Sequence, residues 1–436
     1  MPFSALELHP SLLRGIRDLG FTRPTPIQTE AVPPGVAGRD VLACAMTGSG
    51  KTAAFLWPIM QQLLARPRGA TRALILAPTR ELAAQILEDV QDLGTHTPLT
   101  AAAVFGGVGM GPQAAAFRRK VDVLVATPGR LLDHLQHDYA RLDTIEHFVL
   151  DEADRMLDMG FLPDVKRIVN RLPARRQTLC FSATMPEPIV ALTREMLRQP
   201  VHIQLQRRAA PATGITQAVY PVPQQLKRSL LVALLERGDL KQALVFTRTK
   251  HRADRLAKSL ASAGIAVDRI HGNRSQGQRT AALAGFKAGK FQVLVATDIA
   301  ARGIDVEALE HVVNFDVPAV PEDYIHRVGR TARADAVGEA FTLVAPEEEP
   351  ELRAIERAVG KRLPRVTVPD FDYRAASDEK LEVPIAERIA AIRALKAEER
   401  ARAKVNAARR EAAAARAVVT PVLQPSRRFR RGRRSA

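Results

Sequence analysis

Short apolar runs alternate with stretches of helical periodicity along most of the chain. In the first half, these runs lie at residues 41–43, 73–76, 123–125, 148–150 and 178–181. Strands with few polar interruptions, each followed by a helix, are typical of a parallel sheet that is covered on both faces. The first half is therefore predicted to form an α/β unit.

The same pattern begins again in the second half, where apolar runs lie at residues 243–246, 293–295, 311–313 and 340–344. The two series also share sequence, because VLVAT at residues 123–127 recurs at residues 293–297. This repetition predicts two related α/β lobes in tandem.

The boundaries between domains are indicated by changes in composition. The segment from Arg207 to Gly214 carries Pro and Gly and lacks apolar periodicity, as linkers between domains do. We therefore place the first domain at residues 1–208, the linker at 209–214 and the second domain at 215–365.

Residues 366–436 form a different kind of segment. Ala, Arg, Glu and Lys dominate residues 385–416, which favours helix but offers little to bury, and RRFRRGRR at residues 427–434 cannot fold alone. We expect a partly helical and then disordered basic tail. Arginine supplies phosphate-binding forks and stacking planes, so the tail is expected to tether RNA, with a solubilising tail as the alternative.

Length and charge narrow the class of protein. A chain of 436 residues with 46% hydrophobic content is too long for one ordinary core. The balance of 64 Lys+Arg against 47 Asp+Glu gives a formal charge of +17, which favours nucleic acid as partner, because cations bound to phosphates release counterions. No apolar run approaches the roughly 20 residues that span a bilayer, and none looks like a signal peptide. A cytoplasmic protein without a membrane partner is expected, with Cys44 and Cys180 as buried, reduced thiols.

A glycine-rich loop, AMTGSGKT at residues 45–52, lies between an apolar strand and an apolar helix start. In that position, backbone N–H groups and the helix N-terminus can cradle phosphates, while Lys51 reaches the β- and γ-phosphates and Thr52 holds Mg²⁺. Ala45 stands where the generic loop has its first Gly. The predicted phosphate-binding residues are Ala45, Met46, Thr47, Gly48, Ser49, Gly50, Lys51 and Thr52.

Two acidic residues follow the apolar run at residues 148–150. Asp151, at the carboxyl edge of a strand, can orient Mg²⁺ in part through water, and Glu152 can position or deprotonate the attacking water. Such a pair alone is usually a solvated strand end. With the phosphate loop upstream, the two residues instead predict the hydrolytic half of a nucleotide site.

The tetrad Asp151-Glu152-Ala153-Asp154 and its companion motifs resemble the DEAD-box ATP-dependent RNA helicases of superfamily 2, over roughly residues 1–360. The resemblance implies two tandem RecA-like parallel-sheet domains joined by a short linker, the first of which binds ATP. It implies an RNA-stimulated ATPase that hydrolyses ATP to ADP and phosphate, locally unwinds short RNA duplexes and remodels RNA or ribonucleoprotein. ATP and Mg²⁺ are the implied cofactors.

Further motifs extend the resemblance to the nucleotide site. GFTRPTPIQ at residues 20–28, with Phe3 upstream, is similar to the family's adenine-recognition motif. By this resemblance Gln28 bonds the adenine edge, Phe3 stacks on the ring and Thr25 belongs to the same site. Asp305 would approach the ribose.

Two more motifs are similar to the segments that couple hydrolysis to domain movement. Ser182 and Thr184 are expected to bond the carboxylates of the tetrad through their hydroxyls, and Asp154 is the coupling candidate within the tetrad. YIHRVGRTAR at residues 324–333 resembles the motif that brings arginine fingers to the γ-phosphate, although many family members carry Gly at the position of Ala332. The finger candidates are Arg330 and Arg333, and the coupling candidates in this motif are His326 and Arg327.

This split arrangement has a mechanistic consequence. The resemblance gives neither lobe a complete catalytic site, so hydrolysis should require closure of the lobes across the linker. The predicted catalytic residues are Lys51, Asp151, Glu152, Arg330 and Arg333.

Loops after the predicted strands match the family's RNA motifs. Their Gly residues let backbone N–H groups approach phosphates, and their Arg residues can fork onto phosphate oxygens. Contacts to phosphates and 2′-OH groups read no sequence, so largely sequence-independent RNA is the expected partner. The candidate RNA contacts are Pro78, Thr79, Arg80, Gly106, Gly107, Thr127, Arg130, Thr247, Arg248, His271, Gly272, Gln276, Arg279 and Thr297.

Several alternatives stay open at this stage. The compact core and basic tail resemble the bacterial RhlE-type subgroup, and ribosomal or RNA-decay proteins are candidate partners. An ATP-gated RNA clamp with little unwinding would use the same residues. A DNA-stimulated ATPase is a third class, against which the adenine-recognition segment and the tetrad both argue.

Overall fold

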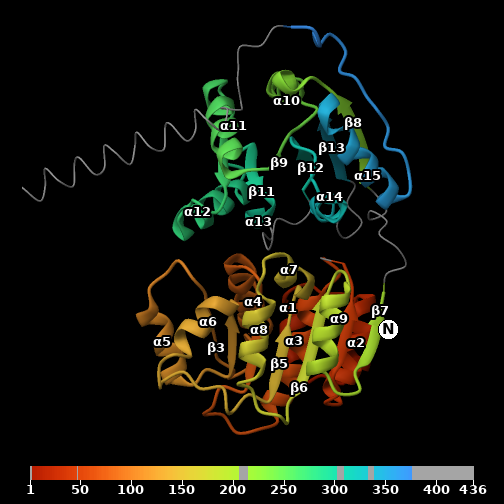
Figure 1. The fold of residues 1–436 in the computed structure, drawn as a ribbon. Helices are drawn as coiled ribbons and strands as arrows, with labels where there is room; N and C mark the ends of the chain where they lie inside the picture. The colour runs from red at the N-terminus through yellow and green to blue at the C-terminus, as the bar shows by residue number, and fades with distance from the viewer. Residues whose placement is uncertain (1, 47, 206–214, 302–308, 332–337, 376–436) are drawn as a thin grey trace, which may run out of the picture. The chain divides into compact units, whose positions relative to one another are not determined.

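The computed structural model describes residues 2–46, 48–205, 215–301, 309–331 and 338–375. Two lobes, at residues 2–205 and 215–375, each contain a parallel sheet with helices (Figure 1). The predicted fold class is thus confirmed. The predicted linker and the tail beyond residue 375 lie outside the described residues. So do the site candidates Thr47, Asp305 and Arg333.

The sheet of the first lobe has the strand order β3-β4-β2-β5-β6-β1-β7, and every neighbouring pair is parallel. Most of its strands are buried along their whole length, as expected of a sheet covered on both faces. The strands are β1 (Val41–Cys44), β2 (Ala73–Leu76), β3 (Ala101–Val104), β4 (Val123–Ala126), β5 (His147–Leu150), β6 (Gln177–Ser182) and β7 (Val201–Gln204).

Helices follow each strand from β1 to β6 and allow the crossovers that parallel pairing requires, and three further helical segments precede β1. They are η1 (Phe3–Leu6), α1 (Pro10–Asp18), α2 (Pro26–Val36), α3 (Lys51–Leu64), α4 (Arg80–Leu93), α5 (Met110–Arg119), α6 (Pro128–His134), α7 (Ala153–Asp158), α8 (Leu162–Val169) and α9 (Glu187–Met196).

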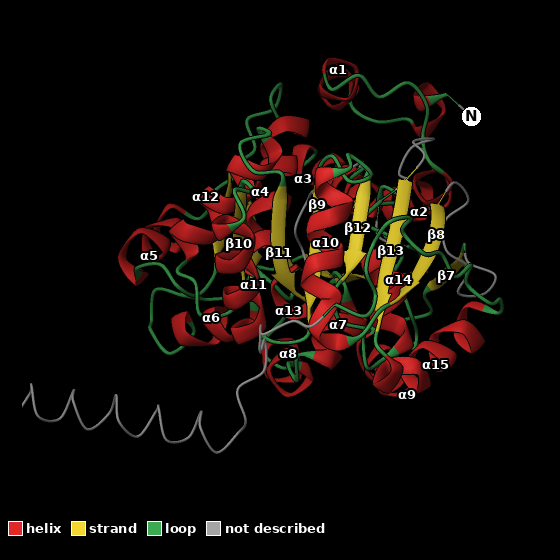
Figure 2. Ribbon diagram, turned by 90° about the horizontal axis from the view of Figure 1, so that it is seen from above, coloured by secondary structure: helices red, strands yellow, loops and turns green. Residues whose placement is uncertain are grey.

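The sheet of the second lobe has the order β10-β11-β9-β12-β13-β8, again parallel throughout (Figure 2). Its strands are β8 (Ile215–Pro221), β9 (Ala243–Thr247), β10 (Val267–Ile270), β11 (Val293–Thr297), β12 (His311–Asn314) and β13 (Gly338–Val344). Its helices are η2 (Gln224–Leu226), α10 (Lys227–Glu236), α11 (Lys250–Ser262), α12 (Gln276–Lys287), α13 (Asp298–Ala301), α14 (Pro321–Val328), η3 (Pro346–Glu348) and α15 (Glu349–Val359).

The two copies of VLVAT occupy equivalent places in the two sheets. The first copy forms β4, which lies one strand from the edge, between β3 and β2. The second forms β11, which lies between β10 and β9 in the same relation. The sequence repeat therefore reflects a repeat of the fold, as predicted.

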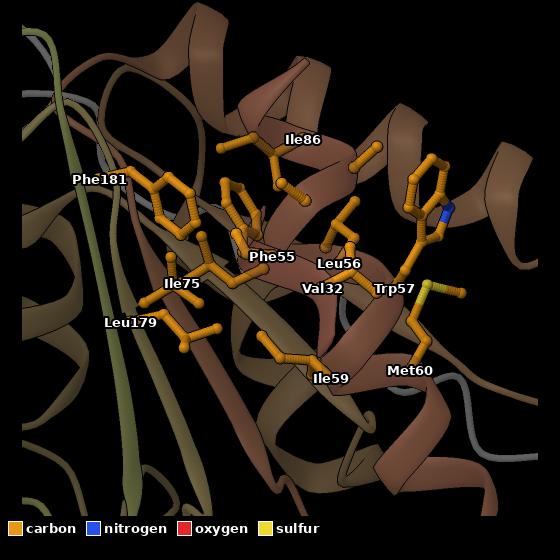
Figure 3. Close-up of a cluster of buried hydrophobic side chains, with 14 of the residues drawn as sticks. Val32, Phe55, Leu56, Trp57, Ile59, Met60, Ile75, Ile86, Leu179 and Phe181 are labelled. Carbon is orange, nitrogen blue, oxygen red and sulfur yellow. The ribbon is translucent and has the colours of Figure 1, made fainter. Parts of the chain in front are cut away.

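Each strand of the first sheet sends alternate side chains to opposite faces. Ile75 packs into the hydrophobic core on the face that α3 covers, whereas its neighbours Leu74 and Leu76 pack into the core on the other face. Figure 3 shows the first of these cores, in which Trp57 and Phe55 of α3 lie among side chains from α2, α4 and β6. Burying each such side chain contributes roughly 1.5–3 kcal/mol, so α3 is held rigidly beneath the loop that precedes it.

The prediction of buried, reduced thiols is confirmed for Cys180 and only in part for Cys44. Both cysteines are free; Cys180 is buried in β6, and Cys44 is partly buried with its thiol donating to the Ala183 carbonyl at 3.2 Å. Within the described ranges, no helix is long and apolar enough to cross a membrane.

Candidate functional site

The phosphate loop connects β1 to α3. Gly48 and Gly50 have φ values of 82° and 89°, in the left-handed region that favours glycine. A Cβ at Gly50 would also lie 2.5 Å from the side-chain nitrogen of Gln28, so a larger residue cannot fit there. The loop conformation is thus specified by its glycines.

Lys51 is buried, and its ammonium donates to the carbonyl of Ala45 at 2.8 Å. The side chain of Ala45 is only 1% exposed, and its N–H donates to the Ser182 carbonyl at 3.0 Å. The substitution of the usual Gly at this position is therefore accommodated, because the methyl group enters the core while the carbonyl fixes Lys51.

The adenine-recognition segment contacts the phosphate loop directly. The side-chain oxygen of Gln28 accepts from the Thr25 N–H at 2.9 Å, and its side-chain nitrogen donates to the Gly50 carbonyl at 3.2 Å. Gln28 is 3% exposed. One amide thus joins the start of α2 to the start of α3.

Two aromatic residues beside this segment pack near one indole. Phe3, the predicted stacking residue, is half-buried against the core, with its ring edge-on to Trp57 at a centroid distance of 5.4 Å. Phe21, which the sequence analysis did not single out, is 43% exposed and lies 6.3 Å from the same indole. Its position directly after Gly20, inside the quoted motif, was the signal that could have identified it.

Asp151 follows β5 and is 3% exposed. Burial raises the pKa of this carboxyl to about 7; Lys51 opposes the shift and Glu152 adds to it. Because the native protein then binds more protons than the unfolded chain between pH 3.8 and about 7, its stability falls as the pH rises through that window. A cation near Asp151 would stabilise the charged carboxylate and so remove this loss of stability.

Glu152 has an unusual backbone for its residue type. Its φ of 50° and ψ of 52° lie in the left-handed region, where a residue with a Cβ is strained. Its carboxylate lies 3.4 Å from Nε of Arg155, and both side chains are buried. The strained backbone and the ion pair together fix the direction of the carboxylate.

Asp154 binds the segment after β6. Thr184 donates to the same carboxylate oxygen through its N–H at 2.8 Å and its hydroxyl at 3.0 Å, whereas the hydroxyl of Ser182 accepts from the Asp154 N–H at 3.0 Å. The predicted hydroxyl–carboxylate bond is therefore made by Thr184 alone. Burial opposes ionisation, but Lys51 and Arg155 hold the pKa of Asp154 below its ordinary value.

The first-lobe RNA candidates gather on the loops after β2, β3 and β4. Gly107 has φ 82°, and a Cβ there would lie 2.1 Å from a guanidinium nitrogen of Arg80, which crosses this loop. Arg130 donates to the Val108 carbonyl of the same loop at 2.9 Å. Thr79 caps α4 by accepting from the Leu82 N–H at 3.2 Å, which is its ordinary structural use.

The carboxyl edge of the first sheet is therefore divided into two halves. The phosphate loop, the tetrad and the Ser182–Thr184 segment follow β1, β5 and β6, which are adjacent strands. The RNA candidates follow β3, β4 and β2, which are also adjacent. Ligands of open α/β sheets bind at this edge, so the two candidate regions lie side by side where such ligands are expected.

In the second lobe, the RNA candidates again follow three adjacent strands, β10, β11 and β9. Arg248 exposes 47% of its side chain, but Thr247 and the ring of His271 are buried, and the His271 ring is 3.0 Å from Asp254. The exposed guanidinium is therefore better placed to reach a phosphate than its two buried companions.

The finger motif lies on and after α14. Arg330 is 5% exposed and follows the end of this helix. Arg327 makes a bidentate pair with Asp298, with bonds of 2.5 and 2.8 Å. Asp298 was not assigned a role from the sequence, although it directly follows Thr297; it ties the finger helix to the end of β11.

Comparison with known proteins agrees with this geometry. The family model described as DEAD/DEAH box helicase matches residues 25–192, and the model described as Helicase conserved C-terminal domain matches residues 226–335. The chain is 40% identical over 382 residues to the DEAD-box ATP-dependent RNA helicase CshA of Bacillus licheniformis, covering 87% of this chain and 78% of that protein. It is 39% identical over 382 residues to CshA of Bacillus subtilis, covering 87% and 77%.

A solved structure of Dbp5 from S. cerevisiae bound to RNA and ADP BeF3 is similar to this chain, with a TM-score of 0.78 and 32% identity over 85% of this chain and 96% of that one. Two parallel-sheet lobes with a phosphate loop and an acidic tetrad define a RecA-like nucleotide hydrolase. The chain belongs to the DEAD-box ATP-dependent RNA helicases, so the predicted activity is confirmed. The RhlE-type subgroup finds no support, because the relatives named above are CshA proteins.

Proposed function

We propose that ATP binds at the carboxyl ends of β1, β5 and β6, with its phosphates between Lys51 and the tetrad. The observation that supports this most directly is that three predicted motifs follow adjacent strands of one sheet. Gln28, bonded to the Gly50 carbonyl, would read the adenine edge and report an occupied loop.

Asp151 and Thr52 would hold Mg²⁺, and the residues present fit that ion. Both donors are oxygens, which Mg²⁺ prefers, and the remaining positions suit water and phosphate oxygens. Asp151 has a buried carboxylate whose pKa is raised to about 7, and a divalent cation would stabilise its charged form. When bound, the ion would neutralise phosphate charge.

Glu152 is proposed to orient the attacking water and to accept its proton, because its carboxylate direction is fixed by the backbone and by Arg155. Arg330 and Arg333 of the second lobe would stabilise the charge on the γ-phosphate, and Asp305 would approach the ribose. These residues belong to different lobes, so hydrolysis would need the lobes to close.

Asp154 and Thr184 would transmit hydrolysis to the rest of the lobe. Three hydrogen bonds join Asp154 to Ser182 and Thr184 at and just after the end of β6, so a displacement of the tetrad must move that segment as well. His326 and Arg327 are proposed as the corresponding residues of the second lobe.

RNA is proposed to follow the loops after β2, β3 and β4 in the first lobe and after β9, β10 and β11 in the second. Arg80 and Arg130 converge on the loop at residues 106–108, where they can bind consecutive phosphates. Such contacts carry no sequence information. The tail after residue 366 is proposed to tether RNA, and the cytoplasm to be the compartment, with ribosomal or RNA-decay proteins as candidate partners.

ATPase activity and duplex separation, measured together with RNA, DNA or no nucleic acid, test this function. We expect RNA to stimulate hydrolysis and a short RNA duplex to separate, because the chain binds one strand in the presence of ATP. Equal stimulation by DNA would indicate a DNA-stimulated ATPase instead. ATP-dependent RNA binding without strand separation would indicate a clamp.

Phe21 is proposed to stack on adenine in place of Phe3. Replacing Phe21 by alanine is expected to weaken binding of the ATP analogue AMP-PNP about tenfold or more, because a base loses its stacking surface. Phe3→Ala is the matched control: it removes a ring that is already in contact with Trp57, so it should lower the melting temperature but keep the affinity. Titration calorimetry measures both. If Phe3→Ala binds AMP-PNP weakly while Phe21→Ala binds it with the wild-type affinity, the stacking role returns to Phe3.

A further inference from the structure

A short segment at residues 315–317, just after β12, receives hydrogen bonds from several cations of the second lobe. The ammonium of Lys227 donates to the Phe315 carbonyl at 2.9 Å. The guanidinium of Arg248 donates to the Val317 carbonyl at 3.1 Å. A fully buried cation and a half-exposed RNA candidate are thus attached to the same stretch of backbone.

Lys227 is the first residue of α10 and is 0% exposed, and its ammonium contacts the carboxylate of Glu348. Glu348 also accepts from the N–H groups of Ala345 at 3.1 Å and Val317 at 3.4 Å. A buried carboxylate is costly unless it is paired and hydrogen-bonded. Lys227 therefore acts as the counterion of Glu348 inside the lobe.

Asp316 has a counterion of its own. Arg252 donates to its two carboxylate oxygens, with bonds of 2.9 and 2.6 Å. The N–H of Arg248 donates to the same carboxylate at 2.8 Å, which fixes the backbone of the loop after β9. The position of Arg248 is thus set through both its backbone and its guanidinium.

The charged residues of this cluster carry a net positive charge. The cations Lys227, Arg248 and Arg252 face the anions Asp316 and Glu348, so this cluster carries three positive and two negative charges, a surplus of one. The two closest pairs are buried, and Arg248 is the exposed member. Its guanidinium already lies 3.6 Å from Glu348, so it would become the main counterion of that carboxylate if Lys227 were lost.

We propose that Lys227 is a positioning residue for RNA: by neutralising Glu348 inside the lobe, it leaves the charge of Arg248 available to an RNA phosphate. This inference rests on the proposed role of Arg248 as an RNA contact. Without Lys227, Glu348 draws the guanidinium inward as its replacement counterion. The phosphate contact is then lost even though Arg248 itself is unchanged.

The test measures the affinity of a single-stranded oligouridylate, in the presence of AMP-PNP, as a function of salt concentration. Arg248→Ala sets the reference: it should weaken binding about tenfold and reduce the slope of log affinity against log salt by about 0.7, as loss of one phosphate contact does. Lys227→Met should reproduce both changes.

The double variant Lys227→Met/Glu348→Gln separates positioning from structural support. With no carboxylate left to capture Arg248, its affinity and salt slope should return to near the wild-type values. A merely structural role for the pair predicts no such recovery. A double variant as weak as Lys227→Met would overturn the proposal, and so would a folded Lys227→Met with wild-type affinity and slope.

Glu348→Gln keeps the proposal testable even if Lys227→Met does not fold. It removes the negative charge 3.6 Å from Arg248, so RNA binding should be unchanged or tighter; a loss of affinity would overturn the proposal. Arg72→Met is the matched control, because Arg72 and Asp122 form a buried pair in the first lobe. It should lower the melting temperature and leave the salt slope unchanged; a reduced slope there would assign the effect to general destabilisation.

The role of Arg248 as an RNA contact and the positioning role of Lys227 can be tested separately. An unchanged slope in Arg248→Ala would remove Arg248 from the RNA contacts, and the role of Lys227 with it. If Arg248→Ala reduces the slope of log affinity against log salt while folded Lys227→Met behaves as the wild type does, the role of Lys227 alone is overturned.

Discussion

Replacing Lys51 by alanine is expected to abolish ATP turnover, with kcat falling by at least about a hundredfold. The ammonium is buried and is held by the Ala45 carbonyl at 2.8 Å, so its charge is aimed into the phosphate loop before nucleotide binds. A preorganised charge of this kind stabilises phosphoryl transfer without reorganisation. Phosphate release at saturating RNA and ATP is the measurement.

The same substitution should change the pH dependence of nucleotide binding. Burial raises the pKa of Asp151 to about 7, and Lys51 is the largest influence that opposes the rise. Without Lys51 the pKa moves higher still, so more of the carboxyl is protonated at neutral pH and Mg²⁺ must displace that proton. The affinity of Lys51→Ala for Mg·AMP-PNP should therefore increase between pH 7 and 8.5 more steeply than that of the wild type.

Lys166→Ala is the control for Lys51. Lys166 is an exposed lysine of the same lobe, 2.8 Å from Glu195, and exposed pairs contribute little to stability. This variant should keep wild-type turnover. If Lys51→Ala hydrolysed ATP at a comparable rate, the phosphate loop would have been assigned wrongly.

Glu152→Gln is expected to keep ATP and RNA binding but to lower hydrolysis by roughly 10²- to 10⁴-fold, the range in which a general base contributes. Glutamine retains the shape of the side chain and can remain beside Arg155, but it cannot take up a proton. Since release of RNA follows hydrolysis in the proposed cycle, the variant should stay on RNA while ATP is present. Single-turnover hydrolysis and RNA dissociation rates measure the two effects.

The matched control for this substitution is Glu195→Gln. It makes the same chemical change at an exposed, ion-paired glutamate of the first lobe and should affect neither rate. Hydrolysis by Glu152→Gln at the wild-type rate would show that Glu152 is not the base. Slow hydrolysis with normal RNA release would instead separate release from hydrolysis.

Parts of the fold that bury continuous apolar runs were predictable from sequence. β2, β4, β5 and β9 are short apolar runs in the interior of a sheet, and their pattern is local. The strands that the pattern did not predict are β3, β7, β8 and β10, each of which is partly exposed, and all of them lie at the sheet edges. An edge strand has one neighbour and less burial, so its sequence carries a weaker signal than a central strand.

The site residues likewise divide into those that the local sequence predicts and those that it does not. The loop at residues 45–52 and the tetrad are contiguous motifs whose spacing reflects local chemistry, and the family follows from them. Phe3 and Phe21 could not be ranked in this way, because both rings lie near Trp57 and only the tertiary structure shows that Phe3 is packed against the core while Phe21 is 43% exposed. Likewise, Lys227 gives no sequence signal: its partner Glu348 lies far along the chain and is brought to it by the strand order of the second lobe.

The sequence by itself determined the class of fold, the repeat of two lobes, the nucleotide and RNA motifs and the family, because each depends on residues that are neighbours in the chain. Only the tertiary structure decided how the carboxyl edge of the first sheet is divided between the candidate nucleotide and RNA loops, that the hydroxyl of Thr184 and not that of Ser182 bonds the Asp154 carboxylate, and which buried charges leave Arg248 exposed. The reason is physical: strand order and burial set the distances between charges, and neither is a property of any local stretch of sequence.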